Sequence, residues 1–543
     1  MKKILFSAIL FLCAQGAMAC TNLIVGKKAS KDGSVIVTYS SDDYGAYGHL
    51  FWQPGGKHNK GDMRALYHYE SNDYLGAIPE ADSTYAVIGL THEHQLTIFE
   101  TTWGGRHELA DSTGLFDYGS LMQVTLQRAR TAREALKVMT DLVDKYGYQS
   151  EGESFTVADA NEVWILEMIG KGPGGGCPVW VARRVPDDCI SGHANQARIR
   201  KFPLNDKENC IYSKDVISFA KKKGYYKGKD EDFSFADAYN PAEHGQARFC
   251  DARVWSFFNK WAAEDMSAHL PYIMEKTFEC NMPLWVKPKQ LLSVQDVKDM
   301  LRDHYEGTPL ALDNDLGQGP WEMPYRPTPL TWKVDGKTYF NERPISTQQS
   351  SNVYVAQMRN YLPDYIGGVV WYGNDEANMV PLVPIYCCTN GAPACFDVKA
   401  GDTFTFSFES AFWLQNWVSN MVYPRYSVLF PELKQVRDEL EKQYNEQQAI
   451  NENTAKLMSE ADAKACLSSY SYGVSAEMMK RWMQLGQTLI VKYNDMAVKT
   501  MNPDGTYKKT KGGVQVGVQR PGYPESYRRK IVEETGDRFL MGE

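Results

Sequence analysis

The amino-acid sequence predicts an α+β protein with a layered core and a helical C-terminal region. Hairpin-like strand patterns fill much of the first two hundred residues, interrupted by one long stretch of helical periodicity. Strand-like sequence rich in Pro and Trp returns over residues 310–400, and beyond about residue 411 the composition shifts to charged amphipathic helices. Because a sheet must bury its apolar face against another layer, we expect stacked sheets and helices.

The first residues are predicted to be a signal peptide rather than part of the fold. Lys2 and Lys3 give a positive start, residues 4–14 form an apolar run, and residues 17–19 read Ala-Met-Ala, a small-x-small cleavage site. The run is shorter than the ~18 apolar residues that a membrane span requires, and no later stretch reaches that length. We therefore expect a chain without a stable membrane anchor, located in the periplasm or secreted, after removal of residues 1–19.

The elements of the first two hundred residues follow from turn signals and periodicity. Asp32-Gly33 is a hairpin turn signal between two apolar runs. Leu121, Val124 and Leu126 begin an apolar series at helical spacing. In chain order we expect strands at 22–25 and 35–37, a loop over 39–60, two strands within 85–105, a helix over 119–146, two strands within 154–186 around a turn at 159–161, and a short strand entering 189–199.

The remainder of the chain divides into a second part of the core and a helical extension. Residues 205–310 look helical and irregular, and residues 310–400 look strand-like. Two charged amphipathic helices are expected within 431–467 and 475–501, and the tail after Asn502 is turn-rich and basic. We therefore predict a main domain over 20–405 and a helical extension over 406–543 that packs on it, with its charge runs on solvated faces.

Composition excludes several classes of protein. The chain has 543 residues, a formal net charge of −8 and 12% aromatic residues, which argues against disorder. Phosphate binding requires clustered Lys and Arg, and no such stripe is present, so we expect no nucleic-acid partner. The eleven cysteines are irregularly spaced and form no pair of CxxC motifs, so structural zinc is not expected. Cys387, Cys388 and Cys395 could hold one disulfide in a tight loop.

Cys20 directly follows the predicted cleavage site. Cleavage after Ala19 would give this residue both a thiol and a free α-amine, which titrate near ~8.5 and ~8, so that one residue supplies a nucleophile and a base. One alternative is a lipid-anchored binding protein with modified Cys20, although Ala17 stands where a Leu-like residue is needed and strand-like sequence follows at once. The other alternative is a disulfide or a buried thiol. The terminal nucleophile accounts for both the placement and the immediate strand.

Several segments in order resemble the cysteine dipeptidases of the N-terminal-nucleophile hydrolase superfamily, the dipeptidase A family. They are CTNLIVGKKASKDGSVIVTYSSDD from Cys20, ETTWGGR from Glu100, NEVWILEMIGKGP from Asn161, HANQARI from His193, ARFCDARVW from Ala247 and STQQSSNVYVAQMR from Ser346. The resemblance covers nearly the whole mature chain. It implies a four-layer αββα sandwich over residues 20–405, dipeptide substrates, and neither metal nor cofactor. The superfamily also contains penicillin V acylases and bile-salt hydrolases, so an amidase of that type is the alternative enzyme.

The resemblance also implies roles for individual residues. Cys20 matches the nucleophile, and Asp42 matches the aspartate that positions the α-amine, with Asp43 as the competing candidate. Asn195 resembles the asparagine of the oxyanion site, unless it is a turn cap at a strand end. Either Arg248 or Arg253 matches an active-site arginine near the thiol, where a cation lowers the thiol pKa; a surface ion pair is the alternative for each.

The segment around His92 departs from the family pattern. Relatives often carry Asn-Glu where this chain has His92-Glu93, so an imidazole would replace an oxyanion-hole amide, or a backbone group would take that role. His92 and His94 lack a third ligand at a recognisable spacing, so no metal site is expected there.

The segment ETTWGGR supplies the candidate substrate-binding residues. Two glycines beside Arg106 would let the backbone approach a ligand while the guanidinium pairs with a carboxylate, and Glu100 starts the same segment. A tight turn with a structural salt bridge is the alternative. The side-chain preference for substrate stays open, and a homo-oligomer is compatible with the sequence.

Overall fold

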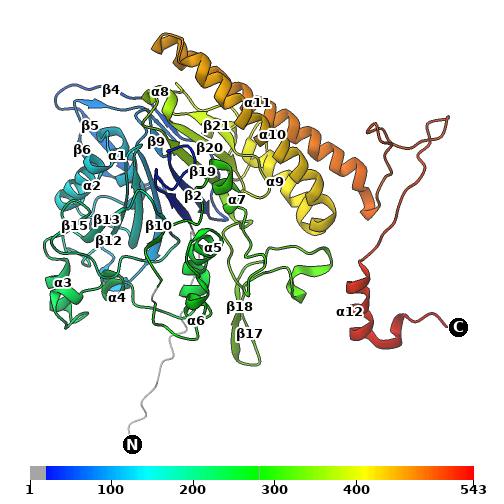
Figure 1. Cartoon of the computed structure of the whole chain (residues 1–543), viewed down its shortest axis with the longest axis horizontal. Coiled ribbons are helices and arrows are strands. Elements are labelled where there is room, and N and C mark those ends of the chain that lie inside the picture. Colours follow the sequence, from blue (N-terminus) through cyan, green and yellow to red (C-terminus); the bar gives the residue numbers. More distant parts are fainter. Residues whose placement is uncertain (1–19, 281, 543) are drawn as a thin grey trace, which may run out of the picture.

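The computed structural model describes residues 20–280 and 282–542, so the predicted signal peptide lies outside the described residues. Figure 1 shows two large β-sheets at the centre, helices beside them, a pair of long helices along one side, and a C-terminal segment that extends away from the body. The observed fold is a mixed α+β architecture with antiparallel sheets and long C-terminal helices, as the sequence predicts at this level.

The first large sheet has seven antiparallel strands and carries the start of the described chain. Its strands, in spatial order, are β16 (Trp285–Val286), β14 (Ile190–His193), β1 (Asn22–Val25), β2 (Val35–Asp42), β19 (Ser350–Met358), β20 (Val369–Asn374) and β21 (Val383–Tyr386). β1 and β2 form the expected hairpin, with Gly33 at φ 77° in its connection, a backbone conformation that favours glycine. β2 runs to Asp42, three residues beyond the start of the loop predicted at 39, because it pairs along its whole length with β19.

The second large sheet has eight strands, whose neighbours are also antiparallel. In spatial order they are β15 (Cys210–Tyr212), β13 (Val179–Val185), β12 (Val163–Ile169), β11 (Gly152–Ala158), β10 (Thr97–Gly104), β9 (Thr91–His92), β8 (Val87–Ile88) and β3 (Trp52–Gln53). Smaller two-stranded ribbons are β4 (Gly56–Lys57) with β7 (Ser83–Thr84), β5 (Met63–Tyr67) with β6 (Tyr74–Pro79), and β17 (Thr331–Val334) with β18 (Lys337–Phe340).

The two large sheets pack against each other through β1 and β2 on one side and β10 and β11 on the other. The rings of Tyr39 in β2 and Phe99 in β10 stack with centroids 5.5 Å apart. Asn22 Nδ2 in β1 donates a hydrogen bond to the backbone oxygen of Glu100 at 2.8 Å, and His193 in β14 bonds the Thr101 hydroxyl at 2.7 Å. These contacts fix the register of one sheet over the other.

Helices contact both sheets. α1 (Tyr118–Arg128) and α2 (Ala132–Tyr146) pack on β10, β11 and β12, whereas α5 (Ala252–Trp261) and α7 (Val294–Met300) pack on the seven-stranded sheet. The shorter helices are α3 (Val216–Lys223), α4 (Phe235–Tyr239), α6 (Leu270–Ile273) and α8 (Asp364–Gly367). The single helix predicted over 119–146 is two helices, because Ala129 is extended and the Thr131 hydroxyl caps α2 by accepting from the Glu134 amide.

Three long helices follow the sheets. They are α9 (Ala411–Val422), α10 (Tyr426–Ala455) and α11 (Glu460–Tyr493). The break between the last two lies at 456–459, before the predicted gap near 470, because the Ser459 hydroxyl caps α11 by accepting from the Asp462 amide. α9 packs on β20, and α10 and α11 pack on β21. The boundary at 405 stays a prediction.

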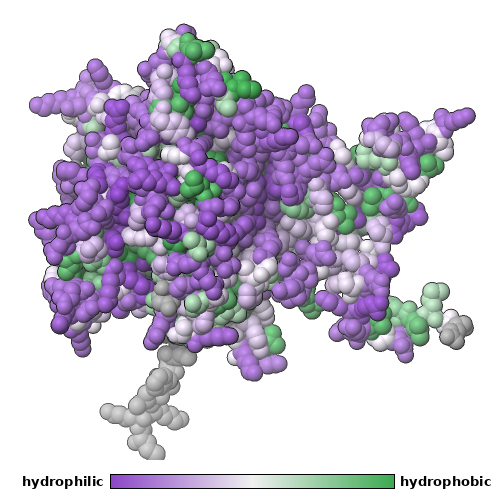
Figure 2. Space-filling model, in the orientation of Figure 1, coloured by the Kyte–Doolittle hydropathy of each residue, from purple (hydrophilic) through white to green (hydrophobic). Residues whose placement is uncertain are grey.

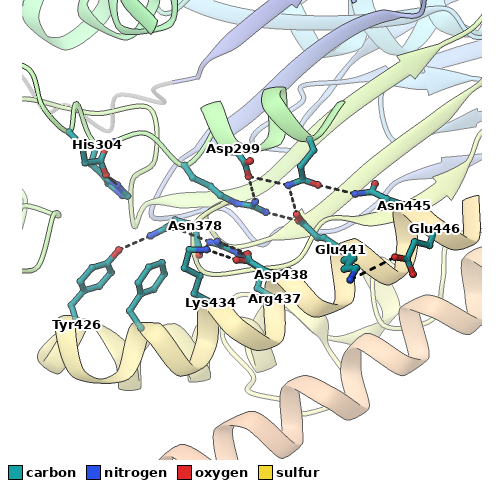
Figure 3. A pocket seen from close by; sticks show the side chains of 15 residues that line it. Asp299, His304, Asn378, Tyr426, Lys434, Arg437, Asp438, Glu441, Asn445 and Glu446 are labelled. Carbon is teal, nitrogen blue, oxygen red and sulfur yellow. Dashed lines mark hydrogen bonds and ion pairs between the residues drawn. The ribbon is translucent and has the colours of Figure 1, made fainter. Parts of the chain in front are cut away.

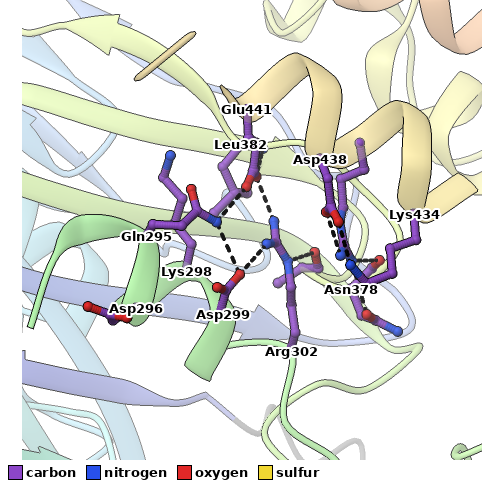
Figure 4. A network of polar contacts seen from close by, with 12 residues as sticks. Gln295, Asp296, Lys298, Asp299, Arg302, Asn378, Leu382, Lys434, Asp438 and Glu441 are labelled. Atoms are coloured by element: carbon purple, nitrogen blue, oxygen red, sulfur yellow. Dashed lines mark hydrogen bonds and ion pairs between the residues drawn. The ribbon is translucent and has the colours of Figure 1, made fainter. Parts of the chain in front are cut away.

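Buried ion pairs join α10 to the core. Arg302, which follows α7, donates to Glu441 of α10 at 2.6 Å, and Glu441 also accepts from the backbone N–H of Leu382 at 2.9 Å (Figure 4). Burial alone would raise the pKa of Glu441. The positive charge of Arg302 outweighs this effect and lowers the pKa of Glu441 to about 2, so the carboxylate is ionised. The interface between α10 and the core therefore contains a specific buried charge pair.

The segment after α11 contrasts with the body. α12 (Glu525–Thr535) buries none of its residues, and Val514, Phe539 and Leu540 are exposed. Figure 2 shows a largely hydrophilic surface on the viewed face, with apolar residues on this C-terminal segment. No helix within residues 20–280 and 282–542 is long and apolar enough to cross a membrane.

Candidate active site

Cys20 lies directly before β1, between the two large sheets, and is completely buried. Its Sγ is 3.5 Å from Glu100 Oε1 and 3.6 Å from the Tyr39 hydroxyl. The Tyr39 hydroxyl also donates to Glu100 Oε1 at 2.6 Å. Strand alternation places Val37 and Tyr39 on one face of β2, so that the tyrosine meets β10 where the sheets face each other.

The surroundings of the thiol favour its protonated form. Burial, with the nearby carboxylates of Glu100 and Asp42, raises the pKa of Cys20 well above its usual range. The Tyr39 hydroxyl and the backbone N–H of Asp42 act in the opposite direction, but they are the smaller effects. The Cys20 side chain is therefore a neutral thiol, and a base is needed to take its proton before it can attack.

Glu100 forms a buried carboxyl pair with Glu153. Glu153 lies in β11 opposite Thr102, whose hydroxyl donates to Glu153 Oε2 at 2.8 Å. The two carboxyl groups hydrogen-bond each other, which requires a proton on one of them. Burial raises the pKa of both carboxyl groups, and the charge of Glu100 raises the pKa of Glu153 further, so the pair favours holding one shared proton.

Arg253 of α5 holds the main chain at Cys20. Its Nη1 donates to the Cys20 carbonyl oxygen at 2.6 Å and to the Thr21 hydroxyl at 2.8 Å, and its Nη2 donates to Asn195 Oδ1 at 2.9 Å. Burial and the neighbouring Arg343 lower the pKa of Arg253 to about 10, so the guanidinium is still charged near neutral pH.

Asp42 ends β2 and is completely buried. It forms an ion pair with Arg343, accepts from the Ser350 hydroxyl at 2.5 Å and accepts from the Ser40 hydroxyl at 3.1 Å. The pairing of β2 with β19 places Ser350 directly opposite Asp42. A carboxylate with these donors is fixed in position beside Cys20.

Asn195 lies just after β14 with a φ of 54°, a left-handed conformation that asparagine tolerates. Its Nδ2 donates to the Thr102 backbone oxygen at 2.6 Å, while its Oδ1 accepts from Arg253. The amide thus connects the end of β10 to the arginine that holds Cys20.

Of the residues selected from the sequence, the structure brings Cys20, Asp42, Asn195 and Glu100 into one cluster. Arg253, the second of the two arginine candidates, joins them, and Arg248 does not contact Cys20. Arg248 forms an ion pair with Glu342, and its guanidinium lies 4.7 Å from the centroid of the Phe340 ring. Arg248 lies in the π-helical turn Ala247–Asp251 and Arg253 lies in α5, and the two arginines have different partners.

His92 and Arg106 lie outside this cluster. His92 Nε2 bonds the Ala129 backbone oxygen at 2.9 Å and His92 Nδ1 accepts from the His94 amide at 2.8 Å, so main-chain groups engage both ring nitrogens. Burial lowers the pKa of His92 to about 3, which keeps it neutral. Arg106 donates to the Ala238 backbone oxygen at 2.7 Å and stacks on the Tyr225 ring at 3.9 Å. The structure gives neither residue a contact with Cys20.

Sequence reasoning missed Tyr39, Glu153 and Arg343. Strand alternation in β2 is a signal that could have found Tyr39. Glu153 is recognisable only from the pairing of β10 with β11. Arg343 comes from the irregular segment between β18 and β19, which has no periodic pattern.

A second candidate site is a cavity of about 860 Å³ between α10 and residues 295–306 (Figure 3). Its charged groups pair with one another: Arg437 donates to Asp438 at 2.8 Å, and Arg302 donates to Glu441. None of the residues that line it is a cysteine or serine. It offers neither a thiol nor a serine hydroxyl, so the cluster around Cys20 is the better candidate.

The described residues show neither a metal site nor a disulfide. No group of three or more His, Cys, Asp or Glu within residues 20–280 and 282–542 is arranged to hold a metal ion. The ten cysteines of the same residues are free, including Cys387, Cys388 and Cys395, for which the sequence left one disulfide open.

A buried thiol beside a carboxyl group, with its main chain held by an arginine, offers the kinds of group that cysteine-type hydrolases use. Comparison with known proteins agrees with this class. The model of peptidase family C69 matches residues 19–65 and 62–439. This chain therefore belongs to peptidase family C69.

Relatives named dipeptidase or probable dipeptidase align with most of the chain. A probable dipeptidase of Salmonella dublin is 29% identical over 417 residues, which cover 71% of this chain and 85% of that protein. A probable dipeptidase of Latilactobacillus sakei is 25% identical over 507 residues, 90% of this chain and 98% of that protein. Dipeptidase A of Lactobacillus helveticus is 24% identical over 436 residues, 75% of this chain and 83% of that protein.

Proposed function

We propose that this protein is an exported dipeptidase that hydrolyses dipeptides through the thiol of Cys20 as the N-terminal residue. The observation that carries the proposal is the placement of Cys20: a buried thiol directly before the central strand β1, with its carbonyl oxygen held by Arg253. Similarity to proteins named dipeptidase over most of the chain supports the substrate class.

The fold that goes with this proposal is the αββα sandwich of N-terminal-nucleophile hydrolases. Two facing sheets, with α1 and α2 on one and α5, α7 and α9 on the other, are consistent with it. Export is supported by the apolar run at 4–14 and the Ala-Met-Ala sequence before Cys20. The proposed location is the periplasm or the exterior of the cell.

In the first half of the proposed reaction, the α-amine freed by cleavage takes the proton of the Cys20 thiol. The raised pKa of the thiol makes such a base necessary. The sulfur then bonds to the carbonyl carbon of the first residue, and the carbonyl oxygen becomes an oxyanion near Asn195. When this intermediate collapses, the carbon–nitrogen bond breaks, the leaving amine takes the proton from the α-ammonium, and a thioester remains.

In the second half, water gives a proton to the α-amine as it adds to the thioester carbon. The carbon–sulfur bond then breaks, and the proton returns to the sulfur. Asp42 favours and orients the ammonium form of the terminus, since its carboxylate is fixed by Arg343 and Ser350. Arg253 keeps the Cys20 main chain, and with it the attacking atom, in register with Asn195.

The test is a panel of dipeptides with the processed protein and with a form that retains residues 1–19. Intact mass establishes whether the processed chain begins with an unmodified Cys20. Turnover of dipeptides by the processed form, and loss of turnover in the unprocessed form, is the expected result. A processed chain with added acyl mass at Cys20, or equal turnover by both forms, overturns the proposal. Preferential cleavage of penicillin V or a bile-acid conjugate would assign the site to an amidase.

A further inference from the structure

The carboxyl pair beside the thiol is not used by the reaction steps above. Glu100 and Glu153 are both completely buried. Within residues 20–280 and 282–542, their polar partners are Tyr39, Cys20, Thr102 and each other, all of them uncharged or acidic. Two buried carboxyl groups without a cation lower the stability of the folded state, because each loses hydration and neither gains a counter-charge.

We propose that the Glu100–Glu153 pair binds the free α-ammonium group of the substrate and thereby selects peptides with an unblocked amino terminus. The inference rests on the proposed function, since it concerns the same site and names the group by which that site recognises a dipeptide. Neither glutamate takes part in bond making; each is a substrate-binding residue.

Geometry places Glu100 within reach of the α-ammonium of a substrate that Cys20 attacks. The α-nitrogen of a peptide is about 2.5 Å from the carbonyl carbon of its own residue, because one Cα separates them. A sulfur poised for attack is about 3–3.5 Å from that carbon. The α-nitrogen therefore lies within about 6 Å of Sγ, and a carboxylate oxygen 3.5 Å from Sγ can contact it. Glu100 Oε1 is that oxygen.

The charges around Cys20 are divided between two sides of the residue. Arg253 donates to the Cys20 carbonyl oxygen, and Arg343 donates to the Thr21 hydroxyl at 3.4 Å and pairs with Asp42. The contacts of the thiol itself are Glu100, Tyr39 and the backbone N–H of Asp42. An incoming ammonium therefore meets negative charge on the thiol side.

Hydrogen-bonding capacity also fits a cation with several N–H groups. No N–H or O–H group of the described residues donates to Glu100 Oε2 or Glu153 Oε1; the two carboxyl groups supply only the proton that they share. An ammonium group has three donors and can bond Glu100 Oε1 and Oε2 while the carboxyl pair keeps its shared proton. An N-acetylated substrate offers one neutral N–H in place of three charged donors, and it adds bulk where the pair is buried.

The experiment compares L-alanyl-L-alanine with N-acetyl-L-alanyl-L-alanine for the processed wild-type protein and for Glu100→Gln and Glu153→Gln. Glutamine keeps the size of the side chain and removes its capacity to ionise, so neither variant can carry the shared proton and the negative charge of the carboxyl pair. We expect both variants to raise KM for the free dipeptide at least tenfold and to reduce the preference for it over the acetylated peptide by the same factor. The matched control is Glu151→Gln, because Glu151 is exposed and lies near Glu153 without joining the pair.

A second measurement does not depend on the variants folding. Inhibition of the wild-type protein by L-alaninamide is compared with inhibition by N-acetyl-L-alaninamide, and we expect the free amine to bind at least tenfold more tightly. Equal inhibition by the two amides overturns the inference, as does a Glu100→Gln variant that loses kcat equally on both peptides with unchanged selectivity. If the wild-type protein cleaves no dipeptide at all, the proposed function fails instead, so the two failures are distinguishable.

Discussion

The guanidinium of Arg253 donates to the carbonyl oxygen of Cys20 at 2.6 Å across 233 residues of sequence. The same side chain reaches the oxygen of Asn195 at 2.9 Å. One buried cation thus fixes both Cys20, the proposed nucleophile, and Asn195, the amide that is proposed to stabilise the oxyanion. This contact joins α5 to the start of β1, so the packing of a helix on a sheet controls the geometry of the site.

Arg253→Lys tests this relationship. A lysine keeps the charge but cannot reach both the Cys20 carbonyl and Asn195, and a displacement of about 1 Å at a reacting group lowers kcat on the order of 100-fold. The matched control is Arg248→Lys, because Arg248 pairs with Glu342 and does not contact Cys20. Steady-state kinetics on a dipeptide should show the loss for the first variant and near wild-type kcat for the second. Equal losses would contradict the assignment of the active-site arginine.

Cys20→Ala should abolish turnover while leaving the fold intact, because alanine fits the buried position and removes only the sulfur. The expected loss is at least about 1,000-fold in kcat, since no other group replaces the nucleophile. Cys189→Ala is the control: this thiol is also buried, but its polar contact is Asp188, outside the Cys20 cluster. Dipeptide hydrolysis and thermal melting of both variants are the measurements. Residual wild-type activity in Cys20→Ala would place the nucleophile elsewhere.

Asp42→Asn should lower both stability and activity. Arg343 would lose its buried carboxylate partner, which costs about 3–5 kcal/mol in unfolding free energy when one partner of a buried pair is removed. Activity should fall because the α-ammonium loses its counter-charge. The control variant is Asp43→Asn, because the Asp43 carboxylate lies outside the core, where it accepts a hydrogen bond from the Gly45 amide at 2.8 Å. Urea unfolding and a pH–rate profile separate the two effects, and an unchanged profile in Asp42→Asn would count against the orienting role.

The stability of the protein should fall in acid partly through His92. Its pKa is about 3 in the folded chain and about 6.5 when unfolded, so below pH 6.5 the unfolded chain binds a proton that the folded chain does not. The stability that the neutral His92 contributes is therefore fully present above pH 6.5, and it decreases as the pH falls from 6.5 toward 3. In His92→Asn the slope of unfolding free energy against pH should decrease by about 1.4 kcal/mol per unit in this range. Urea titrations at several pH values measure the slope, and identical slopes would show that His92 is protonated in the folded state.

Glu441→Gln should weaken the docking of α10 on the core. The variant leaves Arg302 buried without its main counter-charge, at a cost of about 3 kcal/mol. The control is Glu439→Gln on the same helix, because its pair with Arg481 is partly exposed and contributes less than about 1 kcal/mol. Denaturant unfolding compares the two, with protease sensitivity of the C-terminal helices as an independent measure. Equal effects would mean that apolar contact alone holds α10.

Local signals in the sequence were sufficient for many elements. Asp32-Gly33 located the first hairpin, and the composition change near residue 411 coincides with the start of α9 at Ala411. Local signals misplaced helix ends where a capping side chain interrupts an apolar series. A single apolar series runs through both α1 and α2, but α1 ends where Ala129 is extended and the Thr131 hydroxyl starts α2 as its N-cap. Ser459 has the same effect between α10 and α11.

By itself, the sequence determined which cysteine to consider and why, because Cys20 follows a cleavage motif and precedes a strand. The tertiary structure decided what surrounds it. Glu100, Arg253 and the Arg343 that fixes Asp42 are separated from their partners by 80, 233 and 301 residues. Such contacts depend on the stacking of two sheets and the docking of a helix, which no local periodicity encodes.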